Sequence, residues 1–171
     1  MTDHGFRPEP HRSTDLLGLV TGGEGAITGT VVCAAVIAFG VSHADSTAQL
    51  ALAILATVGV YWLAHLHAVT IGNALRHGHH PVKDFGHALG ETAPVALVSV
   101  IPLAVLLLTR ILGASLAAST WTALGTTIAL LATYSYRAGV RVGLGPWGRL
   151  GSATAGAGIG VLVALLKIGL H

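Results

Sequence analysis

The chain consists of long apolar runs separated by short polar connections. Five of these runs could cross a hydrocarbon core of roughly 30 Å, which takes about 20 helical residues. Because lipid offers the backbone no hydrogen-bond partners, each run is expected to be a helix, and none shows the alternation of a β-barrel strand. The expected spans are residues 16–42, 48–75, 94–112, 116–137 and 150–170. The pattern therefore predicts an all-α polytopic membrane protein with about five transmembrane helices.

Composition agrees with a membrane protein of one domain. Of the 171 residues, 53% are hydrophobic and only 9% are charged, whereas a soluble domain carries about 25% charged residues. The net charge of +2 comes from scattered Lys and Arg without a basic patch, so nucleic acid is not an expected partner. Cys33 is the single cysteine, which excludes an internal disulfide and a cysteine-based zinc motif.

The distribution of positive charge predicts the orientation. With the N-terminus in the cytoplasm, seven of the nine Lys and Arg lie inside, and only Arg110 and Lys167 lie outside. This bias favours an N-in, C-out, multi-pass protein of the cell (plasma) membrane. The inside residues are Arg7, Arg12, Arg76, Lys83, Arg137, Arg141 and Arg149.

The same topology divides the chain into two parts. Residues 1–15 are expected to be a cytoplasmic tail. Residues 16–171 form the transmembrane domain, with a histidine-rich cytoplasmic connection at 76–93. A cleaved signal peptide ending at the small pair Ser42 and Ala44 is the alternative interpretation of the first span. We expect that span to be retained.

Glu24 is the only acidic side chain inside an expected span. A charge deep in the bilayer costs at least about 2.5 kcal/mol, so an ionisable residue there is a candidate for function. The flanking glycines Gly22, Gly23 and Gly25 leave room beside the carboxylate for an ion or water. In the alternative, Glu24 lies near the cytoplasmic surface, where water reaches it.

The second span carries an unusual set of polar side chains. We place Tyr61, His65, His67 and Asn73 with Glu24 along a transport path. Because His65 and His67 are two positions apart, they lie about 200° apart on a helix and cannot bind one ion from the same face. An interhelical hydrogen bond, a metal or proton role, and haem ligation remain open for each imidazole.

A third group of polar residues lies in the connection after the second span. Pro81 is a favourable first residue of a helix, and His80, Asp84, His87 and Glu91 then share one helical face. Imidazoles and carboxylates suit Fe, Mn, Zn or Co. One ion could be bound by His80 with Asp84, or by Asp84, His87 and Glu91. A solvated loop is the alternative.

Glycine pairs four residues apart allow helices to approach closely in lipid. The bundle's own packing is the simpler explanation, and a dimer seam or a pore lining is the alternative. The pairs are Gly18 with Gly22, Gly25 with Gly29, and Gly156 with Gly160. The sequence contains no nucleophilic triad, phosphate-binding loop or dinucleotide fingerprint, so we expect neither an enzyme nor an organic cofactor.

Three motifs resemble the vacuolar iron transporter family. The stretch GGEGAIT is similar to its first-span pattern, Asn-Asp-Gly followed by an aliphatic residue and Ser or Thr, with Glu24 at the acidic position. The histidine-rich connection stands where the family has its cytoplasmic metal-binding region. The last span, preceded by Gly148 and Arg149, resembles the small-residue-rich final helix. The resemblance implies a five-helix protomer, a homodimer, and proton-coupled export of Fe2+ or a similar ion.

The sequence therefore predicts transport of a divalent transition metal ion resembling Fe2+ or Mn2+. Glu24, His80, Asp84, His87 and Glu91 are the expected metal ligands. A carboxylate or an imidazole binds metal only when deprotonated, so ion and proton exclude each other. The alternatives are a non-catalytic assembly partner or simple channel, and a haem-binding membrane subunit.

Overall fold

The computed structural model of the chain describes residues 24–40, 44–77 and 81–169, apart from the side chains of residues 77 and 81–84. All secondary structure in these ranges is helical, which confirms the all-α fold. The tail at 1–15, the start of the first span, His80 and the pair Gly18 and Gly22 lie outside the described residues. The helices are α2 (Glu24–Gly40), α3 (Thr47–His77), α4 (Pro81–Leu97), α5 (Val100–Ile111), α6 (Leu116–Arg141) and α7 (Pro146–Gly169).

Four helical stretches are long and apolar enough to cross a membrane: Thr47–Arg76, Phe85–Ile111, Leu116–Arg141 and Pro146–Gly169. Helix α2 is also apolar, and its described part has 17 residues. Large apolar side chains point away from the bundle on several helices, for example Leu52, Leu108 and Leu162. Such an exterior suits contact with lipid.

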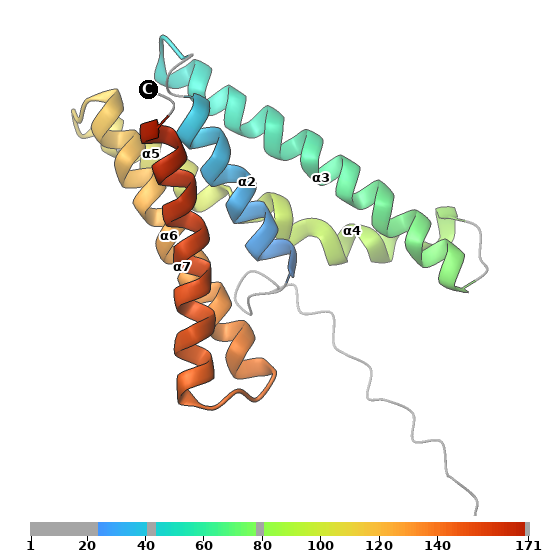
Figure 1. Cartoon of the computed structure of the whole chain (residues 1–171). Coiled ribbons are helices and arrows are strands. Elements are labelled where there is room, and N and C mark those ends of the chain that lie inside the picture. Colours follow the sequence, from blue (N-terminus) through green and yellow to red (C-terminus); the bar gives the residue numbers. More distant parts are fainter. Residues whose placement is uncertain (1–23, 41–43, 78–80, 170–171) are drawn as a thin grey trace, which may run out of the picture.

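Helix α2 lies in the middle of the bundle, where it packs against α3, α4, α6 and α7 (Figure 1). Its fully buried residues recur every three or four positions and so lie on one side of the helix, and most of its other residues are half-buried. Most of these side chains are small, so they fit between close neighbours. Helices α6 and α7 run side by side, whereas α3 is strongly inclined to them (Figure 1). The largest buried cluster contains residues of α2, α3, α5, α6 and α7. Its members are Cys33, Ala34, Ile37, Ala38, Leu50, Ile54, Val58, Leu106, Ala123, Leu124 and Val163.

Two of the predicted glycine pairs lie in helix contacts within the chain. A Cβ on Gly29 would be 2.8 Å from Val98 Cγ2, and one on Gly25 would be 3.0 Å from Val95 Cγ2. On α7, a Cβ on Gly156 would be 2.6 Å from the Leu131 carbonyl oxygen of α6. The bundle's own packing therefore accounts for these glycines.

The third expected span differs from the observed helices. We predicted one helix at 94–112, but the structure has α4 from Pro81 through Pro94 to Leu97 and then α5, with a break between them. Proline at 94 removes one hydrogen bond without ending the helix. At the break, Ser99 N donates to the Ala96 carbonyl instead of continuing the α-helical pattern. Pro102 has no N–H to offer the Val98 carbonyl, so a second α-helical hydrogen bond is missing beside the break.

The connections alternate between the two ends of the bundle. The start of α3 and the α5–α6 connection lie at the upper left of Figure 1, whereas α3 ends at the right and the α6–α7 connection lies at the bottom. At the top, Arg110 Nε donates to Thr47 Oγ1 at 2.8 Å, which joins the end of α5 to the start of α3. This alternation fits a chain that crosses the membrane an odd number of times. Which end of the bundle faces the cytoplasm stays a prediction.

Candidate polar site between α3 and α4

Asn73 and Glu91 join α3 to α4 near the end of the bundle where α2 begins. Asn73 is buried at 8% exposure, and its Nδ2 donates to Glu91 Oε2 at 3.5 Å. Its Oδ1 accepts a bond from Arg76 Nη2 at 2.9 Å, so the amide NH2 is the group directed at the carboxylate. The 3.5 Å bond is long, and therefore weak, which leaves the Glu91 oxygens available to another partner.

A second polar contact joins the same two helices. Trp62 Nε1 donates to Thr92 Oγ1 at 3.2 Å, and the Thr92 hydroxyl donates to the Ala88 carbonyl at 2.9 Å. Thr92 is fully buried, so its oxygen is satisfied both as donor and as acceptor. These bonds, together with Asn73–Glu91, fix how α3 and α4 lie against each other along the length of the contact.

His87 lies one helical turn before Glu91 on α4, and both side chains are exposed. Residues four apart on a helix share a face, so the imidazole and the carboxylate can reach one ion. Helix α4 starts at Pro81, as the sequence predicted. Asp84 lies in the same helix, but its side chain and the whole of His80 fall outside the described residues.

Glu24 is the first described residue of α2, and its side chain is exposed. The next residue, Gly25, packs on Val95, and Glu91 lies one turn before Val95 on α4. Along the two helices, Glu24 thus directly precedes Gly25 and Glu91 lies one turn before Val95, the residues that form this contact between α2 and α4.

Tyr61 and His65 stack on each other, with ring centroids 6.1 Å apart and planes 7° from parallel. His65 is half-buried and His67 is exposed, which agrees with the prediction that they occupy different faces. Among the described residues, no hydrogen bond or ion pair joins either imidazole to Glu24. Nor do three His, Cys, Asp or Glu side chains gather at one point among those residues.

The structure brings together residues that the sequence analysis had treated separately. Asn73 was assigned to the transport path and Glu91 to the cytoplasmic ligands, yet they share a hydrogen bond. The roles of Arg76 and Thr92 were missed. The available signal was the occurrence of an amide, a hydroxyl and an indole in otherwise apolar helices, because polar groups in lipid point into the bundle.

These features define the class of the protein: its helices and apolar exterior are those of an integral membrane protein, with a polar contact at one end of the bundle. No family model, curated protein or solved structure matches the chain. The resemblance to vacuolar iron transporters thus stays a prediction.

Proposed function

We propose that the protein carries a divalent transition metal ion resembling Fe2+ or Mn2+ across the membrane, by proton-coupled export from the cytoplasm. The observation that supports this most is the Asn73–Glu91 contact, in which an amide of α3 is directed at a carboxylate that lies one helical turn from His87 on α4. Glu24 lies beside the same α2–α4 contact. Oxygen and imidazole nitrogen ligands are those preferred by Fe2+, Mn2+, Zn2+ and Co2+.

In this proposal the neighbouring helices α3 and α4, called the hairpin below, receive the ion first. His87 and Glu91 supply one nitrogen and one carboxylate, and water completes the coordination. Asp84 and His80 are proposed as further ligands from the same end of α4. Asn73 acts on the ion through Glu91, because its amide NH2 orients the carboxylate and is itself oriented by Arg76.

Transfer into the bundle then involves Glu24 and the polar face of α3. Because Gly25 and Gly29 have no side chains, this part of α2 lies close to α4. We propose that the Glu24 carboxylate can therefore receive the ion from His87 and Glu91. Protons compete for the same carboxylates and imidazoles. Exchange follows if these groups bind an ion on one side of the membrane and a proton on the other. Tyr61, His65 and His67 continue the proposed path along α3, and a homodimer is part of the proposal.

The test is metal uptake into proteoliposomes with an imposed pH gradient. We expect flux of Fe2+, Mn2+, Zn2+ or Co2+ in the wild type, and loss of flux in Glu91→Gln and Glu24→Gln. Asp45→Asn is the matched control, because Asp45 is an exposed carboxylate at the opposite end of α3. Thermal unfolding of each variant separates loss of transport from loss of folding.

Two results would reject this function. Absence of flux and of bound metal in the folded wild type would favour an assembly partner or simple channel, and a Soret band in the purified protein would favour a haem-binding subunit. Equal flux in Glu91→Gln and the wild type would remove the hairpin from the mechanism.

A further inference from the structure

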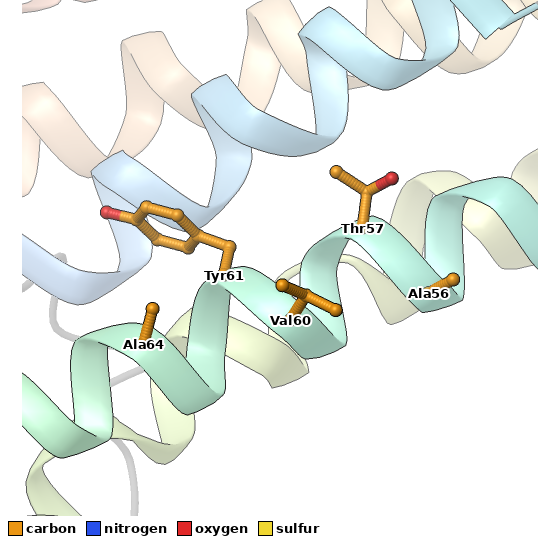
Figure 2. A pocket seen from close by; sticks show the side chains of 5 residues that line it. All are labelled: Ala56, Thr57, Val60, Tyr61 and Ala64. Atoms are coloured by element: carbon orange, nitrogen blue, oxygen red, sulfur yellow. The ribbon is translucent and has the colours of Figure 1, made fainter.

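Two adjoining shallow depressions form an open apolar groove along α3 and the facing side of α2. One has a volume of about 520 Å³ and is lined by Ala56, Thr57, Val60, Tyr61 and Ala64 of α3 (Figure 2). The other, of about 410 Å³, is lined by Ala35, Val36, Phe39, Gly40, Ala53 and Thr57. Thr57 belongs to both, so the groove continues from one depression into the next. All of these lining residues are uncharged.

The groove narrows toward the α2–α3 connection. There the two helices touch, because a Cβ on Gly40 would be only 2.9 Å from Leu50 Cδ1. From that point the helices diverge toward the other end of the bundle (Figure 1). Tyr61 leans from α3 toward α2 across the wider part (Figure 2). The space between the helices is therefore a wedge walled by small side chains, with aromatic rings from Phe39 and Tyr61 at its sides.

The surroundings of the groove limit what can fill it. Helix α3 is one of the stretches suited to cross a membrane, and α2 is apolar along its described length. Val60 is 68% exposed on the groove wall, so the groove opens outward from the bundle. In a bilayer that opening faces hydrocarbon, where the solvent is lipid tails rather than water.

We infer that this groove binds an acyl chain of a membrane phospholipid. A flexible chain can follow a wedge that narrows to a point, and apolar walls without charge provide van der Waals contact along it. A helix from a second copy is a rod of about 10–12 Å diameter and cannot enter the narrow end. The groove shares no residue with the α3–α4 polar site, although its Tyr61 also belongs to the proposed ion path along α3, and the inference does not depend on metal transport.

The experiment uses the full chain in phosphatidylcholine vesicles that contain a phosphatidylcholine with a photoactivatable group on its acyl chain. After irradiation, labelled residues are mapped by mass spectrometry over a series of labelled-lipid concentrations. We expect the groove positions Ala35, Thr57 and Val60 to label more than Leu162, which is exposed on α7. Labelling in the groove should saturate, because a bound chain occupies a defined site.

A matched pair of substitutions tests the groove directly. Ala56→Phe places a ring in the groove and should lower the labelling of Thr57 and Val60 several-fold. Ala129→Phe adds the same ring on the exposed surface of α6, outside the groove, and should leave this labelling unchanged. Thermal unfolding of both variants verifies that they are folded.

Other occupants give different results. Equal labelling of all exposed helices, or unchanged labelling in Ala56→Phe, would overturn the inference. Disulfide-linked dimers of Ala56→Cys formed under mild oxidation would show that a second copy covers the groove, and would also overturn it. The native Cys33 does not interfere, because it is fully buried. If the wild type showed saturable labelling of the groove but no metal flux, the proposed function would be rejected and the inference about the groove would stand.

Discussion

Gly29 of α2 lies directly against the backbone carbonyl of Val95 on α4, so closely that a Cβ on Gly29 would overlap the oxygen. Val95 is one turn above the break between α4 and α5. The N–H of Ser99, which would bond this carbonyl in a regular α-helix, donates to Ala96 instead. Because Gly29 has no side chain, α2 can cover a carbonyl that the break has released, and Cα–H···O contacts of this type are common where helices pack.

Replacing Gly29 with alanine should therefore destabilise the bundle. The added methyl group must push α2 away from α4, and overpacking of this kind costs about 1–3 kcal/mol. Gly125→Ala on α6 is the control, because a Cβ there meets nothing within 4 Å. We expect a lower thermal unfolding midpoint in detergent for Gly29→Ala and an unchanged or slightly higher one for Gly125→Ala. Equal midpoints would mean that the two helices are not in close contact.

The contact between α6 and α7 allows a sharper comparison within one helix. A Cβ on Gly156 would lie 2.6 Å from the Leu131 carbonyl oxygen, whereas one on Gly158 meets nothing within 4 Å. Gly156→Ala should cost about 1–3 kcal/mol, and Gly158→Ala should cost nothing because alanine is the better helix former. Unfolding of the two variants in the same detergent measures the difference. If Gly158→Ala lowered the stability more than Gly156→Ala, α7 would pack on α6 through a different face from the one that carries Gly156.

How far the sequence predicts the fold depends on the span. The runs at 48–75, 116–137 and 150–170 agree with α3, α6 and α7 to within a few residues, because an uninterrupted apolar run in lipid can only be a helix. The break between α4 and α5 was not predicted. It depends on a missing N–H at Pro102 and on a released carbonyl covered from another helix, and a hydropathy pattern records neither.

The candidate site was predicted only in its parts. Asn73 and Glu91 were each selected for their polar side chains, but the sequence analysis assigned Asn73 to the transport path and Glu91 to a separate cytoplasmic site, and did not predict their contact. Their contact depends on the packing of α3 against α4, which apolar periodicity cannot specify when most faces of the helices are apolar. The central place of α2 was hidden for the same reason. Its small side chains are compatible with burial on any face.

The Trp62–Thr92 contact should be measurable as a coupling between α3 and α4. A double-mutant cycle with Trp62→Phe and Thr92→Val removes the indole donor and the hydroxyl acceptor separately and together. Interhelical hydrogen bonds in membrane proteins average about 0.6 kcal/mol by this method, so a coupling of that size is expected. The readout is the free energy of unfolding in mixed micelles. Zero coupling would indicate that the indole bonds elsewhere.

Topology can be tested by cysteine labelling. If the N-terminus is in the cytoplasm, Asp45→Cys should react with a membrane-impermeant maleimide added to intact cells, and Gly145→Cys should react only after permeabilisation. Both positions are exposed, and they lie at opposite ends of the bundle. Arg141 and Arg149 near Gly145 favour the cytoplasmic side for that end. The reverse labelling pattern would invert the proposed direction of export.

The Asn73–Glu91 contact predicts a specific change in metal affinity. Asn73→Ala removes the amide that orients the Glu91 carboxylate but leaves every proposed ligand in place. Loss of an orienting partner typically lowers metal affinity about tenfold or more, and Glu91→Gln should lower it further because a ligand charge is lost. Thr70→Val is the matched control on α3, since its buried hydroxyl bonds only the Leu66 carbonyl. Calorimetric titration of the purified variants with Mn2+ and Co2+ gives the affinities. Wild-type affinity in Asn73→Ala, with weaker binding in Glu91→Gln, would leave Glu91 as a ligand but exclude an orienting role for Asn73.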